Sequence, residues 1–289
     1  MRHRLLPWLA ATLPLMMWAC SGGSVATTTT ASVETSEELF EDFASATFGS
    51  STEIDNQWWP LAPGTQFVYE GVTRIDGEEI PHRLISTITD LTKVIGDVRT
   101  VVLWEEDYQD GVLLEAELAF FAQDDGGNIW HLGQYPEEYE EGEIVATPSW
   151  IAGVEEARAG IFMPSDPRPE TPSYSQGWGP AVEWYDRAQV FEAGQSTCVA
   201  AGCYEEVLLI DEFDLVEPNF FQVKYYAPGV GIVKVGWKGP DPEQEELELV
   251  EVIQLNAEGL AEARASALEL ETRAYELSKN VYGTTDPAE

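Results

Sequence analysis

The chain has 289 residues, with 15 Lys and Arg against 52 Asp and Glu, and a formal net charge of −37. This charge balance excludes nucleic-acid binding through phosphate contacts, and it excludes docking to an anionic membrane by charge alone. Hydrophobic residues make up 44% of the chain, which is enough for a globular core and argues against a chain that is disordered throughout.

The N-terminus has the pattern of a bacterial export signal. Two arginines precede an apolar stretch, Leu5 to Trp18, which is too short and too interrupted by proline for a convincing membrane span. Ala19 before Cys20 fits a small-residue cleavage site of the lipoprotein type. We expect residues 1–19 to be a signal peptide and Cys20 to carry lipid. The alternative is an ordinary secretory signal with a chance cysteine.

Residues 20–56 are expected to form the lipidated cysteine, a flexible tether and a short helix. Ser, Thr, Ala and Gly dominate residues 21–35, a composition typical of mobile linkers. Thr35 to Glu38 has the spacing of a capping box, which predicts the start of the short helix.

Residues 57–255 have the pattern of an antiparallel β meander. Hairpin turn signals recur along this stretch, at Asp76-Gly77, Gly96-Asp97, Asp110-Gly111 and 124–127. Between them, apolar and polar residues alternate, which predicts strands with one buried and one solvated face. We predict a mainly β fold: a curved sheet, a half-barrel or a sandwich.

Residues 256–282 are predicted to form an amphipathic C-terminal helix, followed by a tail over 283–289. Asn256 is a favourable N-cap, and Leu and Ala recur at spacings of three and four residues from Leu260 to Val281. We expect this apolar seam to pack on the chain's own sheet, and a coiled-coil dimer is the alternative.

The cysteines point to one disulfide. If Cys20 is lipidated, Cys198 and Cys203 remain as a pair in an oxidising compartment. Four residues separate them, a spacing that suits a clamp across a turn between strands. A metal or redox pair is the alternative, but the spacing is not that of a Cys-x-x-Cys motif.

Three sets of residues are candidates for chemistry. Asp124, Asp125 and Asn128 form a tight acidic turn whose oxygens suit Ca²⁺, although a plain hairpin turn also explains them. The aromatic side chains of Tyr174, Trp178, Trp184 and Tyr185 flank a Pro- and Gly-rich segment. They could bind a ligand or belong to the core.

Glu115 and Glu117 are the third set. They lie on one face of a predicted strand, about 7 Å apart by strand rise. We expect a solvated strand face here, and a carboxylate pair that serves a glycoside hydrolase is the alternative. The sequence has no Gly-x-Ser-x-Gly, His-Glu-x-x-His or P-loop motif.

Several stretches together resemble a family of exported, lipoprotein-type bacterial β proteins without an assigned activity. The resemblance is carried by the opening from Trp59 to Tyr69, with Pro60-Leu61-Ala62-Pro63-Gly64, and by the ending from Lys224 to Val233, with Tyr226-Ala227-Pro228-Gly229-Val230-Gly231. Phe121 to Trp130 and Ser149 to Pro164 are similar to its middle part. The resemblance implies export and a β fold, and it leaves the C-terminal helix outside.

We therefore expect a monomeric envelope protein, anchored to the membrane by its N-terminal lipid and placed on the outer membrane, facing the periplasm or the exterior. Its expected role is a non-catalytic binding or structural module, with a lipid, a glycan or another envelope protein as ligand. A carboxylate-dependent hydrolase of envelope polysaccharide and a calcium-stabilised surface protein are the alternatives. No cofactor is expected apart from calcium.

Overall fold

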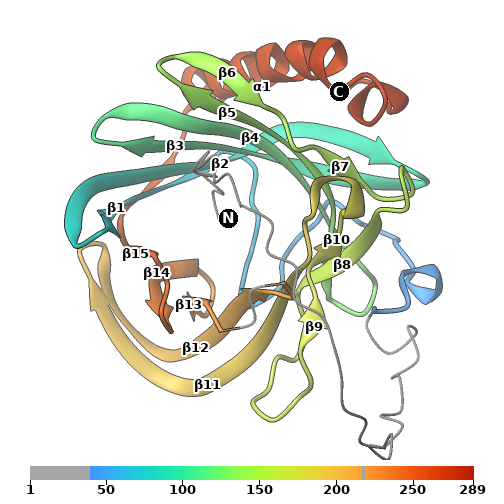
Figure 1. Cartoon of the computed structure of the whole chain (residues 1–289). Helices are drawn as coiled ribbons and strands as arrows, with labels where there is room; N and C mark the ends of the chain where they lie inside the picture. Colours follow the sequence, from blue (N-terminus) through green and yellow to red (C-terminus); the bar gives the residue numbers. More distant parts are fainter. Residues whose placement is uncertain (1–39, 217–218) are drawn as a thin grey trace, which may run out of the picture. The chain divides into compact units, whose positions relative to one another are not determined.

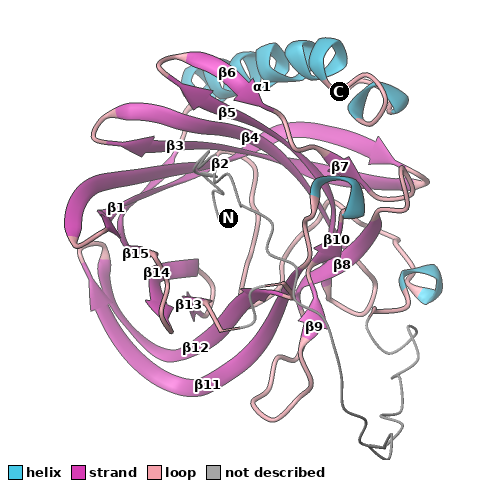
Figure 2. Ribbon diagram, in the orientation of Figure 1, coloured by secondary structure: helices cyan, strands magenta, loops and turns pink. Residues whose placement is uncertain are grey.

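The computed structural model describes residues 40–216 and 219–289. The predicted signal peptide, the lipidation site Cys20, the tether and the capping box at 35–38 lie outside these residues. The described chain is mainly β, with one α-helix (Figures 1 and 2). Its strands are β1 (Thr65–Ile75), β2 (Glu78–Ile95), β3 (Val98–Gln109), β4 (Val112–Gln123), β5 (Ile129–Glu140), β6 (Glu143–Ala146), β7 (Trp150–Ile151), β8 (Arg158–Met163), β9 (Tyr174–Ser175), β10 (Gly177–Trp178), β11 (Asp186–Val199), β12 (Gly202–Asp214), β13 (Phe221–Ala227), β14 (Gly231–Lys238) and β15 (Glu243–Gln254).

The strands form one antiparallel sheet that nearly closes on itself. The order is β10-β8-β5-β4-β3-β2-β1-β15-β14-β13-β12-β11-β9, and β6 and β7 pair with β5. The two terminal strands, β9 and β10, are separated in sequence by Gln176 alone, so the sheet curls into a ring (Figure 1). The predicted antiparallel β domain is confirmed, and its curvature exceeds that of an open half-barrel.

The hairpin turns lie where their sequences predict them. Asp76 and Gly77 join β1 to β2 with φ of 53° and 84°, and Asp110 and Gly111 join β3 to β4 with φ of 48° and 76°. Two successive positive φ angles are typical of a type I′ turn, whose twist matches that of the flanking strands. These short turns explain why sequential strands pair as neighbours.

Helix α1 (Ala257–Leu277) covers the outer face of the sheet. The Asn256 side chain caps its first turn by accepting hydrogen bonds from the backbone N–H groups of Glu258 and Gly259. Its buried Ala267, Leu270 and Ala274 belong to one apolar cluster with alternate residues of β4, Ala116, Leu118 and Phe120. The prediction that the helix packs on its own sheet is confirmed. The opposite face of β4, which carries Glu115 and Glu117, points into the ring.

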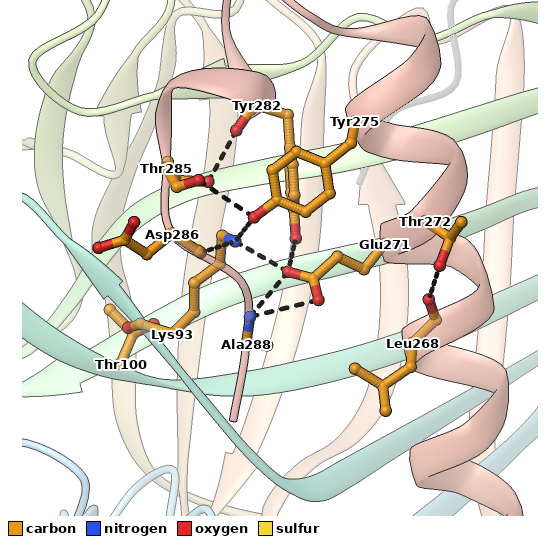
Figure 3. A network of polar contacts seen from close by, with 10 residues as sticks. All are labelled: Lys93, Thr100, Leu268, Glu271, Thr272, Tyr275, Tyr282, Thr285, Asp286 and Ala288. Carbon is orange, nitrogen blue, oxygen red and sulfur yellow. Dashed lines mark hydrogen bonds and ion pairs between the residues drawn. The ribbon is translucent and has the colours of Figure 1, made fainter.

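The helix is shorter than predicted, because the chain after Leu277 turns back onto the sheet. The helix was predicted over 256–282, but it ends at Leu277. A 3₁₀ turn, η3 (Tyr282–Thr284), follows, and residues 286–289 lie against β2. Figure 3 shows the reason: the fully buried Lys93 ammonium lies 2.8 Å from Glu271 Oε1 and donates to the Asp286 carbonyl. Glu271 in turn accepts hydrogen bonds from the Tyr282 hydroxyl and the Ala288 N–H.

Cys198 and Cys203 form the predicted disulfide, opposite each other in the β11–β12 hairpin. The predicted start of the short helix lies outside the described residues, and the first element within them is a 3₁₀ turn, η1 (Phe43–Ser45). None of the helices in residues 40–216 and 219–289 combines the length and the hydrophobicity of a membrane span.

Candidate functional site

Four carboxyl groups line the inner face of β3 and β4. The strand register places Glu105 opposite Glu117 and Asp107 opposite Glu115, so each pair has Cβ atoms about 5 Å apart. We call these four residues the carboxylate wall. Glu117 is 1% exposed, so the prediction of a solvated face for Glu115 and Glu117 is wrong. The sheet curls into a nearly closed ring, and the polar face of β4 lies inside it.

Glu117 is the most unusual member of the wall. Neither of its carboxylate oxygens has a hydrogen-bond partner among the described residues. Burial raises its pKa well above the usual range for a carboxyl group, and the charges of Glu115 and Glu105 raise it further. Burial also raises the pKa of Glu105, against the effect of a hydrogen bond with Ser86. Both effects favour the neutral form of the Glu117 carboxyl group over its charged form.

A second acidic group lies on β11 and β12. Asp186 is opposite Asp214 in the strand register, and Glu212 is two residues before Asp214 on the same face. Burial, together with the charges of Asp214 and Glu212, raises the pKa of Asp186 to about 7. The Lys224 ammonium lies 2.6 Å from Glu212, so this lysine neutralises the second group rather than Glu117.

His82 links three strands beside the carboxylate wall. Its Nε2 lies 2.8 Å from Asp107 Oδ1, and its Nδ1 lies 2.9 Å from Thr73 Oγ1 and 3.4 Å from Glu245 Oε1. His82, Asp107 and Glu245 are the one set among the described residues that brings three metal-type ligand atoms within 4.8 Å of one another. Sequence reasoning passed over this set, because its members lie on different strands with no short spacing to reveal them.

Buried polar atoms without a hydrogen-bond partner concentrate on the inner face. Among the described residues, such atoms belong to seven side chains: Glu117, His131, Gln134, Trp150, Tyr174, Asp211 and Tyr226. All except Asp211 lie on the inner face by strand register. Native proteins leave few buried polar groups unpaired. We call the six inner-face residues the orphan set.

The four aromatic residues proposed from the sequence divide between two places. Tyr174 is buried on the inner face, and Trp184 stacks on Trp150 at a ring distance of 4.9 Å. Trp178 and Tyr185 contact each other at 4.2 Å and are half-buried. Of the four, Tyr174 is itself a member of the orphan set, and Trp184 contacts Trp150 and His131 of that set.

His131 lies in the same aromatic environment. Its ring stacks on Phe121 and contacts Trp150 and Trp184 edge-on. Burial lowers the pKa of His131 to about 3, so the imidazole is neutral across the physiological range. Neutral His131 can donate or accept a hydrogen bond, and its Nδ1 has no partner among the described residues.

The acidic turn proposed for calcium is held by its own hydrogen bonds. Asp124 accepts from the backbone N–H groups of Gly126 and Asn128 and from the Trp130 indole. Asp125 accepts from the Gly49 N–H. These contacts account for the acidic residues as hairpin residues, and calcium binding at Asp124, Asp125 and Asn128 stays a prediction.

Comparisons with known proteins concern the fold. No family model matches the chain, and no curated protein matches it. A crystal structure from Bacteroides fragilis, of a protein assigned as exported with a YmcC-like fold, matches with a TM-score of 0.39 and 15% identity over 68% of this chain and 99% of that chain. A crystal structure from Parabacteroides distasonis, of a protein assigned as a lipoprotein, matches with a TM-score of 0.32 and 11% identity. The match covers 69% of this chain and 100% of that chain. Likenesses at this level carry no functional conclusion.

Proposed function

We propose that the protein is exported, anchored to the bacterial envelope by lipid on Cys20, and that its β domain binds a glycan on the inner face of the sheet. In this role the domain is a non-catalytic binding module. Export and anchoring rest on the N-terminal sequence from Met1 to Cys20. Glycan binding rests on the chemistry of the inner face.

The orphan set carries the binding proposal. It offers hydroxyl groups on Tyr174 and Tyr226, an indole N–H on Trp150, and acceptor oxygens on Gln134 and Glu117. Leaving such groups buried without partners costs about 1–3 kcal/mol each. A ligand rich in hydroxyl groups would supply both donors and acceptors to the set. An acyl chain would supply neither, so the inner face is a poor match for a lipid cargo.

Titration with oligosaccharides tests the binding proposal. The exported full-length protein, purified in detergent, is titrated calorimetrically with a panel of oligosaccharides from bacterial envelopes. We expect Tyr226→Phe to weaken binding by roughly tenfold, which corresponds to one lost hydrogen bond, without lowering Tm. Tyr108→Phe is the control, because its hydroxyl donates to Glu106 on the outer face. Absence of binding across the panel, or equal binding by Tyr226→Phe and wild type, contradicts the proposal.

Anchoring has its own test. Cys20→Ser is expected to move the protein from the membrane fraction to the soluble fraction of an exporting host, because the lipid acceptor is gone. Mass spectrometry of the wild-type N-terminal peptide should show the mass of the lipid on Cys20. Unchanged membrane fractionation of Cys20→Ser would contradict lipid anchoring and leave the ordinary secretory signal.

Hydrolysis is a second candidate function, favoured by Glu117. A carboxyl group whose pKa is raised by burial, next to another carboxyl group, is the arrangement that glycosidases use for general acid catalysis. If the domain hydrolyses its glycan, Glu117→Gln should abolish product release while the substrate still binds. Retention of the full rate by Glu117→Gln excludes this role for Glu117.

A further inference from the structure

We propose that the tip of the β11–β12 hairpin, residues 196–205, is a lid on the inner face of the sheet, and that the Cys198–Cys203 disulfide is a thiol-sensitive catch that keeps this lid closed. The lid governs access to the inner face whichever ligand binds there. Only its effect on glycan binding rests on the proposed function.

The tip of the hairpin docks on the edge of a distant strand. The Ala201 N–H donates a hydrogen bond of 3.1 Å to the Leu249 carbonyl of β15. Two strands, β13 and β14, lie between β12 and β15 in the order of the sheet. β14 pairs with β15 at Leu247 and Glu248, and the tip takes the next position along the same edge. The hairpin therefore bends across the ends of β13 and β14 to reach β15.

The tip meets the inner face at Tyr69 of β1. Tyr69 is opposite Leu249 and shares the face of the carboxylate wall by strand register. Its side chain is buried. Burial raises the pKa of Tyr69, and the charges of Glu105 and of Tyr204 from the hairpin raise it further. Tyr204 therefore lies close to Tyr69, so displacement of the tip would open this part of the inner face to solvent.

The hairpin below the tip is irregular, as a hinge requires. The pairing of β11 with β12 shifts its register three times between Val190 and Thr197. Gly194 and Glu206 have positive φ angles of 71° and 55°, and residues 191–194 are exposed. Segments with exposed and interrupted backbone hydrogen bonds open at the lowest free energy in a folded protein. The tip can therefore move while the rest of the sheet stays paired.

The disulfide orders the tip for docking. Cys198 and Cys203 are directly opposite each other, one pair before the turn that carries Ala201. The bond between them fixes this turn and keeps the Ala201 N–H in position for the Leu249 carbonyl. A segment that is ordered in advance loses less conformational entropy when it docks. Cleavage of the bond should therefore shift the hairpin towards its undocked form.

A dithiol reductant can cleave this bond, because both cysteines are exposed. One thiolate of the reductant attacks Sγ of Cys198 or Cys203 and displaces the other sulfur as a thiolate. The second thiol of the reductant then breaks the mixed disulfide. The reductant is oxidised to a disulfide, and the two cysteines together gain two electrons and two protons. A protein dithiol of the bacterial envelope is the class of partner that would open the lid.

Reduction of the folded protein tests the lid without any ligand. The exported full-length protein is compared in its oxidised form, after treatment with dithiothreitol, and as the Cys198→Ser/Cys203→Ser variant. We expect amide hydrogen exchange at Ala201 to become about tenfold faster in the last two samples. Hydroxyl-radical oxidation of the Tyr69 side chain should rise several-fold. Exchange in α1 and β2 should stay the same.

Ser196→Ala is the matched control. It removes a hydrogen bond to Glu205 across the same hairpin and leaves the disulfide intact, so it should behave like the oxidised wild type. Unchanged exchange at Ala201 and unchanged oxidation of Tyr69 after reduction overturn the lid. Loss of protection across α1 and β2 also overturns it, since the disulfide would then hold the whole domain together. A bond that resists dithiothreitol in the folded protein overturns the catch.

A kinetic measurement separates the lid from the proposed function. If an oligosaccharide binds, reduction should raise its association rate constant, because the inner face is accessible for more of the time. An unchanged rate constant, for an oligosaccharide whose binding Tyr226→Phe weakens, overturns the lid as the entrance and leaves glycan binding intact. Absence of binding by every oligosaccharide contradicts the proposed function, and exchange and oxidation then decide the lid alone.

Discussion

Glu117 and Asp186 are carboxyl groups whose protonation should couple to the stability of the fold. Both have a raised pKa in the folded protein, well above the usual range for Glu117 and about 7 for Asp186, with burial as the main cause. The folded chain therefore holds protons that the unfolded chain has released above about pH 4.5. Without a cation, stability should fall as the pH rises from that value through the pKa of the folded state.

The Glu117→Gln substitution should weaken the dependence of stability on pH. The amide cannot ionise, so the variant should have a higher Tm than wild type at about pH 8 and nearly the same Tm at about pH 5. Thermal unfolding followed by circular dichroism over this range provides the measurement. Glu251→Gln, on the exposed outer face, should leave the slope unchanged. A Glu117→Gln protein that is less stable than wild type at about pH 8 would show that the ionised carboxylate is stabilised in the fold.

At the scale of elements, α1 and the C-terminal residues act as a latch on β2. Lys93 of β2 and Glu271 of α1 are 0% and 6% exposed at their side chains, and their charged atoms are 2.8 Å apart. Glu271 also accepts the Ala288 N–H, and the Thr92 and Glu289 backbones pair with each other. One ion pair therefore ties together the strand, the helix and the last residues.

Removing one partner of this pair should lower the free energy of unfolding. Lys93→Met leaves the Glu271 carboxylate buried without its cation, and loss of one partner of a buried pair typically costs about 3–5 kcal/mol. Arg264→Met is the matched control, because Arg264 pairs with Asp90 at a surface where both side chains are more than one-third exposed. That change should cost about 1 kcal/mol or less. Urea unfolding measures both, and similar losses in the two variants would contradict the latch.

At the scale of the whole domain, closure of the sheet depends on a close backbone contact. A Cβ atom added to Gly160 of β8 would lie 2.2 Å from the Gly177 nitrogen and 2.4 Å from the Ser175 oxygen. Ser175 and Gly177 belong to the terminal strands β9 and β10. The absence of a side chain at Gly160 thus lets the two edges of the sheet meet.

Gly160→Ala should open this seam. The methyl group cannot fit without displacement of backbone, so we expect a lower Tm and faster amide hydrogen exchange in β8, β9 and β10. Gly236→Ala in β14 is the control, since a Cβ there would meet nothing within 4 Å. If sheet closure also forms the glycan site, Gly160→Ala should weaken binding as well. Wild-type stability and exchange in Gly160→Ala would exclude a tight seam.

Local signals in the sequence were sufficient for the elements of this protein. Asp76-Gly77 and Asp110-Gly111 indicate hairpins because their backbone preferences are set by the two residues themselves. Asn256 and the Leu and Ala spacing identify the start and the buried face of α1. The Cys198–Cys203 disulfide follows from their short spacing and from the fact that two cysteines remain if Cys20 carries lipid. Each of these features depends on residues that are close together in the chain.

The inner face was decided by tertiary structure alone. Alternation in β4 indicates that Glu115 and Glu117 share a face, but the period of a strand does not tell whether the polar face meets solvent or the interior of a closed sheet. That outcome depends on a contact between Gly160 and residues 175–177 and on the pairing of β1 with β15. His82, Asp107 and Glu245 likewise meet only after distant strands have paired. Sequence patterns report which residues share a face, whereas contacts between distant segments decide what that face encloses.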